Sequence, residues 1–107
     1  MGIGAHNYGS KIMNKYEAMF IVRPDLSEED KKSLFQQIND IVTKNSGVVD
    51  QGALWADKKK LFFPIKKYTE GVYYLLNFSL NPLAIKDMRH AYKLNENILR
   101  VLIVKLD

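Results

Sequence analysis

Segments with strand and helix periodicity follow one another along this chain in an order that few folds accommodate. Four segments have the character of strands and two have apolar residues spaced three to four positions apart, in the order β-α-β-β-α-β. That order is the split βαβ, or ferredoxin-like, arrangement of the α+β class. Each helical segment has a single apolar stripe, so both helices are expected on one face of a four-stranded antiparallel sheet. The other face must then meet solvent or a partner.

The first half of the pattern has clear boundaries. Residues 15–23 predict a strand with apolar residues on both faces, which is typical of a central strand. Ser27 is a good N-cap for a helix over residues 27–45, and Gly47 fits the left-handed position just past its end. The later elements are expected as strands at residues 48–67, 72–80 and 98–106, a hairpin turn at residues 68–71 and a helix at residues 82–93.

Residues 48–67 are harder to interpret because several signals interrupt the strand pattern. A bulge or bend is expected between Gly52 and Asp57. Pro64 cannot donate to a ladder hydrogen bond, so this strand is expected at a sheet edge, where lysines also discourage pairing with another chain. Further on, Asn81 and Pro82 predict the start of the second helix.

The chain of 107 residues has room for one domain. Residues 1–12 contain three glycines and no periodic apolar face, which predicts a flexible N-terminal extension or an alternative upstream start, with Met13 as a natural start. Residues 13–107 are expected to form a single domain.

Composition excludes several classes of protein. The chain has no cysteine and two distant histidines, so no metal site or cofactor is expected. The apolar runs are far shorter than the ~20 residues that cross a bilayer, and the start lacks the pattern of a secretory signal. These features predict a cytosolic protein without a membrane partner.

Charge is distributed unevenly, which suggests a polyanionic partner. Residues 58–107 hold ten basic and four acidic side chains, whereas residues 13–57 hold five basic and eight acidic ones. Two basic groups stand out: a lysine tract within residues 58–67, and a helix face within residues 86–93. Edge protection explains the first group equally well, and a solvated helix face explains the second. Together they favour a surface that contacts phosphates.

Arg100 interrupts the apolar pattern of the last strand and is expected to point off the open sheet face. There it could contact a phosphate bidentately, or it could pair with Glu17 on the first strand.

Motifs for catalysis are missing. The sequence has no glycine-rich phosphate loop and no convincing Ser-His-Asp set. An acylphosphatase would need a glycine-rich anion loop beside its arginine, and the sequence after Arg23 has none. RNA-recognition modules share the element order, but Glu70 and Val72 stand where a basic residue and an aromatic residue are expected. Neither class is favoured.

Four motifs in the right order resemble bacterial small-subunit ribosomal protein six. They are the Tyr-Glu signature in residues 13–17, the Pro-Asp signature in residues 23–27, the basic segment with Leu and Pro-Ile in residues 58–67, and the Asn-Glu-x-Ile-x-Arg pattern in residues 94–100. The chain departs from the family at Asp57, where glycine is usual, and at Phe62 and Phe63, which replace a small residue and a tyrosine.

The resemblance implies a structural, non-enzymatic component of the small ribosomal subunit in the cytoplasm. Its implied partners are the central domain of small-subunit ribosomal RNA and small-subunit ribosomal protein eighteen, with no small-molecule substrate. A ferredoxin-like ligand-binding or regulatory module remains the alternative, and a small hydrolase is a more distant one. The residues expected to contact RNA are Lys58, Lys59, Lys60, Arg89, Lys93 and Arg100.

Overall fold

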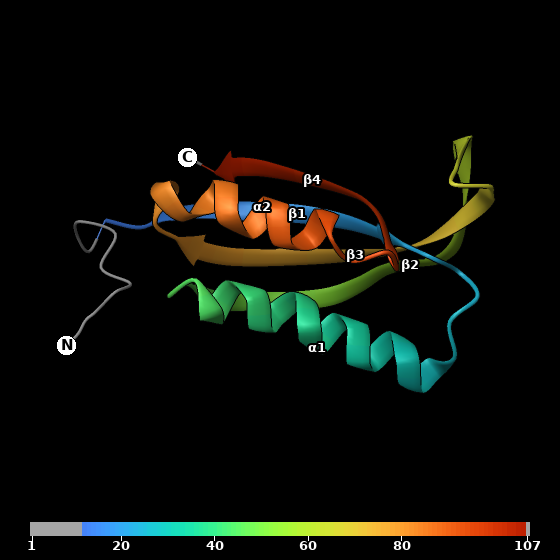
Figure 1. Ribbon diagram of the computed structural model, residues 1–107, viewed down its shortest axis with the longest axis horizontal. Helices are drawn as coiled ribbons and strands as arrows, with labels where there is room; N and C mark the ends of the chain where they lie inside the picture. The colour runs from blue at the N-terminus through green and yellow to red at the C-terminus, as the bar shows by residue number, and fades with distance from the viewer. Residues whose placement is uncertain (1–11, 107) are drawn as a thin grey trace.

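The computed structural model describes residues 12–106. The predicted extension, residues 1–12, lies outside the described residues except for Ile12, so it stays a prediction. The elements are β1 (Asn14–Val22), α1 (Glu28–Lys44), β2 (Val48–Ile65), β3 (Tyr68–Leu80), the 3₁₀ turn η1 (Pro82–Ala84), α2 (Ile85–Lys93) and β4 (Ile98–Leu106) (Figure 1).

The four strands form one antiparallel sheet in the order β2-β3-β1-β4. This confirms the ferredoxin-like α+β fold, with β1 in a central position and β2 at an edge. Pro64 therefore lies on an edge strand, where its missing N–H does not interrupt the ladder between two neighbours. The β2–β3 hairpin extends past the helices, on the right of Figure 1.

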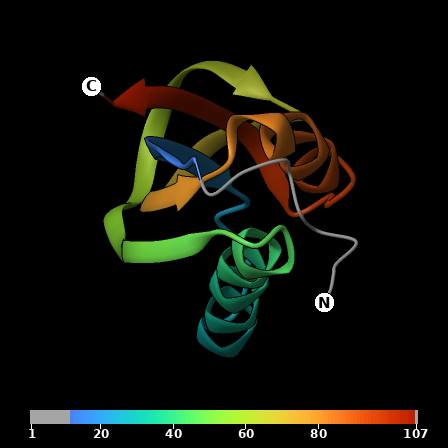
Figure 2. The ribbon, with the colours of Figure 1, turned by 90° about the vertical axis from the view of Figure 1, so that its left-hand side faces the viewer.

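Both helices cover the same sheet face, as the aromatic contacts show. Phe20 on β1 and Tyr74 on β3 are paired across the sheet, so their side chains share a face. Tyr92 of α2 contacts Phe20 edge-on, with ring centroids 4.7 Å apart. Phe35 of α1 stacks on Tyr74 at 4.2 Å. The two helices lie side by side over the core that these rings occupy (Figure 2).

The first helix begins as expected but ends differently. Ser27 caps α1 by accepting a hydrogen bond from the backbone N–H of Asp30 at 3.1 Å. The left-handed residue after the helix is Ser46, with φ 63°, so the prediction for Gly47 was wrong. Gly47 is required for space instead, because a Cβ there would lie 2.7 Å from the backbone oxygen of Ser79 and 2.8 Å from Val42 Cγ1.

The hairpin turn was predicted in the wrong place. The structure turns at Lys66 and Lys67, both with positive φ (49° and 77°), and β3 already begins at Tyr68. Two successive residues with positive φ are the mark of a type I′ hairpin turn. Gly71, the residue that suggested a turn, lies within β3. A glycine is needed at this position because a Cβ there would come within 2.4 Å of Ile21 Cγ2.

Strand β2 contains the predicted irregularity, although its details differ. The register with β3 shifts between Ala56 and Lys59, and Lys58, next to Asp57, takes the left-handed conformation (φ 52°). Asp57 instead lies 3.5 Å from the ammonium group of Lys31, which is only 6% exposed. A hydrogen bond to Glu28 raises the pKa of Lys31 above its ordinary value.

The second helical segment begins as a 3₁₀ turn rather than as an α-helix. The side chain of Asn81 accepts a hydrogen bond from the backbone N–H of Leu83 at 2.9 Å, and α2 proper begins at Ile85. Within residues 12–106, no helix combines the length and the hydropathy that crossing a membrane requires.

Candidate nucleic-acid interface

Three cations from three separate elements surround two adjoining cavities. Lys66 comes from the β2–β3 turn, Lys93 ends α2, and Arg100 lies near the start of β4. The larger cavity, about 660 Å³, is lined by residues 61–66, Tyr73, Leu99 and Arg100. The smaller one, about 230 Å³, is lined by Lys66, Tyr92, Lys93 and residues 98–101. Both cavities are lined by Lys66, Leu99 and Arg100. We call this region the cationic cleft.

The lining of the cationic cleft has a single sign of charge. Its charged members are Lys66, Lys93 and Arg100, and no carboxylate from residues 12–106 lines either cavity. A concave surface with charges of one sign attracts counter-ions of the other sign and concentrates them locally. The cleft is therefore suited to a phosphate group.

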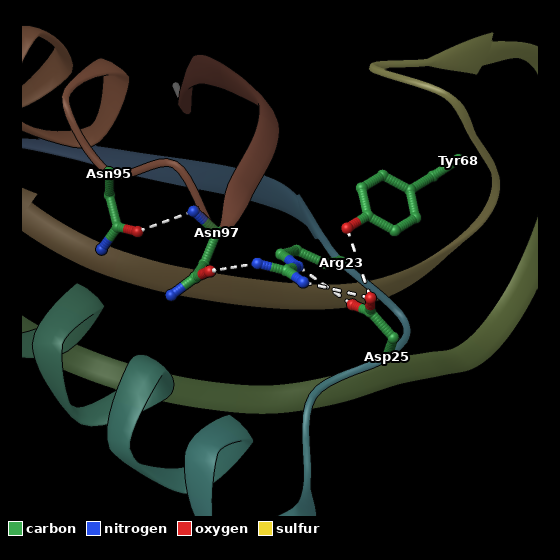
Figure 3. A network of polar contacts seen from close by, with 5 residues as sticks. All are labelled: Arg23, Asp25, Tyr68, Asn95 and Asn97. Atoms are coloured by element: carbon green, nitrogen blue, oxygen red, sulfur yellow. Dashed lines mark hydrogen bonds and ion pairs between the residues drawn. The ribbon is translucent and has the colours of Figure 1, made fainter.

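A polar network connects the hairpin to the start of β4. Arg23, just after β1, donates two hydrogen bonds to the carboxylate of Asp25 (2.9 and 3.1 Å) and one to the side-chain oxygen of Asn97 (3.3 Å). The hydroxyl of Tyr68, the first residue after the turn, donates to Asp25 at 3.3 Å (Figure 3). The backbone N–H of Arg23 also donates to the carbonyl of Asn97 at 3.0 Å. The network holds the base of the turn that carries Lys66 beside the strand that carries Arg100.

Replacing Arg23 with glutamine is expected to raise the pKa of Asp25. The hydrogen bonds from the Arg23 guanidinium hold that pKa below the ordinary value of 3.8, so the acidic form becomes easier to populate once they are lost. Carbon-13 NMR titration of the carboxyl group measures the shift. Amide hydrogen exchange in residues 65–69 should become faster in the same variant, since Tyr68 loses its anchored partner. An unchanged Asp25 titration would contradict the network.

The structure divides the predicted RNA contacts into two groups. Lys93 and Arg100 line the cationic cleft together. Lys58, Lys59 and Lys60 lie on β2, beside the bulge, and none of the three lines either cavity of the cleft. All five side chains are exposed. The ammonium group of Lys59 lies 5.2 Å from the ring centre of Trp55, which is a cation–π contact on the protein itself.

Arg89 belongs to neither of these two groups. It is exposed on α2 and lines a shallow groove with Lys86, Asp87, His90 and Lys93. Asp87 partly neutralises that groove, so its charge is less uniform than that of the cationic cleft. Lys93 borders both.

Arg100 does not pair with Glu17, so that alternative was wrong. The register places Arg100 opposite Ile21, while Glu17 faces Val104, four residues further along β4. Arg100 forms no ion pair with any residue in the described part of the chain, and its side chain is exposed. The cation therefore remains free to meet an external anion.

The open sheet face carries apolar side chains, as the two-helix arrangement requires. Leu102 is 64% exposed and Trp55 54%, and the ring of Trp55 lies 5.6 Å from that of Tyr73. In the middle of this face, the side-chain oxygen of Asn77 is buried without a hydrogen-bond partner among residues 12–106. The exposed apolar area favours a partner on this face.

Sequence reasoning missed two parts of the cationic cleft. Lys66 was recognised as part of a lysine tract but was not selected as a contact, since nothing local indicates that it reaches β4. The polar network of Arg23 was also missed, because Asn97 is 74 residues away. The positions of both depend on the fold. No group of three or more histidine, aspartate or glutamate residues within the described range is placed to hold a metal ion.

Comparison with known proteins gives a consistent result. Residues 15–105 match the model of the family described as ribosomal protein S6. The small ribosomal subunit protein bS6 of Caldanaerobacter subterraneus subsp. tengcongensis is 34% identical, over 89% of this chain and 99% of that protein. Its counterpart in Thermoanaerobacter pseudethanolicus is 36% identical over the same shares, 89% and 99%. The crystal structure of 30S ribosomal protein S6 from Thermotoga maritima shares the fold, with a TM-score of 0.81, 24% identity and 89% coverage of each chain.

Proposed function

Because this chain belongs to the ribosomal protein S6 family, whose members are proteins of the small ribosomal subunit, we propose that it binds the central domain of small-subunit ribosomal RNA together with small-subunit ribosomal protein eighteen. Its place is the cytoplasmic ribosome, and we assign it a structural rather than a catalytic role.

The observation that carries the RNA part of the proposal is the cationic cleft. Lys66, Lys93 and Arg100 converge there from separate elements, without a carboxylate of the described residues in the lining. Lysine and arginine bound to phosphates release counter-ions, which supplies affinity that does not depend on base sequence. Lys58, Lys59 and Lys60 on β2 and Arg89 on α2 are exposed cations outside the cleft, and we propose them as further backbone contacts.

The open sheet face supports the protein part of the proposal. Exposed Leu102 and Trp55 form an apolar surface on this face. A protein partner would cover that apolar area. We propose this face for protein eighteen; it adjoins the cationic cleft, because Arg100 lies on the same side of β4 as Leu102.

Replacing Arg100 with glutamine tests the RNA contact. We expect weaker binding of a central-domain RNA fragment in the presence of protein eighteen, and a plot of log K against log salt that is shallower by about one unit, the effect of losing one phosphate contact. The stability of the free protein should stay within about 0.5 kcal/mol, because Arg100 is exposed and makes no ion pair within residues 12–106. Filter binding at several salt concentrations and urea unfolding measure the two quantities.

Lys105→Gln is the matched control, because it removes one exposed cation from the far end of the same strand. Its salt dependence should equal that of the unmodified protein. An unchanged salt slope in Arg100→Gln would remove Arg100 from the RNA contacts. Failure of the unmodified protein to bind the fragment, with protein eighteen present, would refute the proposed function as a whole.

A further inference from the structure

The larger cavity of the cationic cleft has aromatic as well as cationic walls. Phe62 and Phe63 both line it, and their relative exposures are 101% and 80%. Successive residues of a strand point to opposite sides, so both rings can be exposed only where neither side of the hairpin is covered. Single exposed apolar residues are ordinary on protein surfaces, but two neighbouring rings that line a cavity are an exposed patch.

The cavity places these rings beside cations. Lys66 and Arg100 line the same space as Phe62 and Phe63, and Tyr73 contributes a third ring. The volume of the cavity, about 660 Å³, lies within the usual range of small-molecule sites, about 300–1,000 Å³. The combination of flat apolar rings and cations matches the two ends of a nucleotide, which are a base with a π face and a phosphate.

The two central positions of the β2–β3 turn, Lys66 and Lys67, have a backbone conformation that lysine rarely adopts. A type I′ turn prefers asparagine and glycine, because both central residues have positive φ. Here both positions are lysines, and a third lysine, Lys58, also has positive φ within the same hairpin. Left-handed backbone is unfavourable for lysine. The unfavourable backbone conformation of Lys66 lies next to the cavity, and such strain is common at functional sites.

We propose that this cavity holds one unstacked RNA nucleotide, with its base stacked on one ring of the Phe62–Phe63 pair and its phosphate between Lys66 and Arg100. The inference rests on the proposed function, since the RNA is the ribosomal RNA that the protein binds. Sequence-specific recognition of RNA commonly uses bases that are splayed out of the helix and stacked on aromatic side chains. The uniform positive charge favours this occupant over an apolar protein segment.

Replacing both phenylalanines with alanine separates stacking from charge. We expect the affinity for the central-domain RNA fragment, with protein eighteen present, to fall about 5- to 100-fold, the range for losing one base–aromatic stack. The salt slope should stay the same because no cation is removed. The melting temperature of the free protein should not change, since both rings are exposed. Leu83→Ala removes an exposed apolar side chain that lines neither cavity of the cleft and should leave the RNA affinity unchanged.

The two lysines of the turn offer a second, matched pair of variants. Lys66→Asn should weaken binding and reduce the salt slope by about one, while the free protein stays as stable or becomes more stable, since asparagine tolerates positive φ. Lys67→Asn changes the same turn and the same charge, but Lys67 lines neither cavity of the cleft. It should leave the affinity and the salt slope unchanged.

The outcomes distinguish this inference from the proposed function. If the unmodified protein binds the fragment and the double alanine variant binds equally well, the nucleotide site is refuted while the proposed function stands. If the double variant binds protein eighteen more weakly in the absence of RNA, the rings belong to the protein interface and the inference is again refuted. Substitution of single unpaired adenines by 2-aminopurine gives a direct readout: one probe should change its fluorescence on binding, and only when Phe62 and Phe63 are present.

Discussion

Replacing Phe20 with alanine is expected to lower the free energy of unfolding by about 3–5 kcal/mol, the range for removing a buried phenylalanine side chain. Phe20 is fully buried on the central strand and contacts Tyr92 of α2 and Tyr74 of β3. The cavity would open where both helices meet the sheet, so neither helix could close it without leaving its other contacts. Urea unfolding followed by circular dichroism measures the loss.

The exposed Phe62 provides the matched control for this substitution. Phe62→Ala removes the same atoms from a site that is fully exposed, so its effect on stability should stay within about 0.5 kcal/mol. A domain of this size has a total stability of about 5–15 kcal/mol, so Phe20→Ala should leave a protein that unfolds at far lower urea concentrations. A loss below about 1 kcal/mol would show that the contact between the helices and the sheet is looser than the ring geometry indicates.

Replacing Tyr92 with phenylalanine is expected to make the protein less stable at neutral pH but more stable at pH 12. The Tyr92 hydroxyl donates a hydrogen bond to the carbonyl of Ile38 at 2.8 Å, and its loss costs about 0.5–1.5 kcal/mol. Burial raises the pKa of Tyr92 well above its ordinary value of 10. The unfolded chain therefore releases this proton above about pH 10 while the folded protein keeps it.

The sign of the pH effect follows from proton release on unfolding. Above about pH 10 the folded protein binds more protons than the unfolded chain, so its stability falls by about 1.4 kcal/mol per pH unit for this group. The loss at pH 12 amounts to roughly 2–3 kcal/mol, which exceeds the free energy of the hydrogen bond removed in the variant. Urea unfolding curves at pH 7, 10, 11 and 12 measure both proteins. Parallel pH dependences would contradict the burial of the Tyr92 hydroxyl.

Some parts of the structure were predictable because they depend on local periodicity. Alternation in residues 15–23 identified β1 and sorted its residues onto two apolar faces, of which the one with Tyr16, Ala18, Phe20 and Val22 is buried. The single apolar stripes of the helical segments led to the prediction that both cover one face, and the cap at Ser27 was visible as a residue type at the right position. These features extend over a few residues, so the sequence contains them directly.

The sequence by itself thus determined the order of the elements, the central place of β1 and the apolar stripe of each helix, along with the family that the motifs indicate. Only the tertiary structure decided the site of the hairpin turn. Gly71 suggested a turn, but a glycine is needed there because Ile21 of the neighbouring strand leaves no space for a Cβ. The tertiary structure also decided which cations meet: Lys66, Lys93 and Arg100 border one cleft, while Lys58, Lys59 and Lys60 lie apart from it on β2. The physical reason is that periodicity arises from the geometry of a single helix or strand, whereas a cleft requires the register of the sheet and the reach of a hairpin.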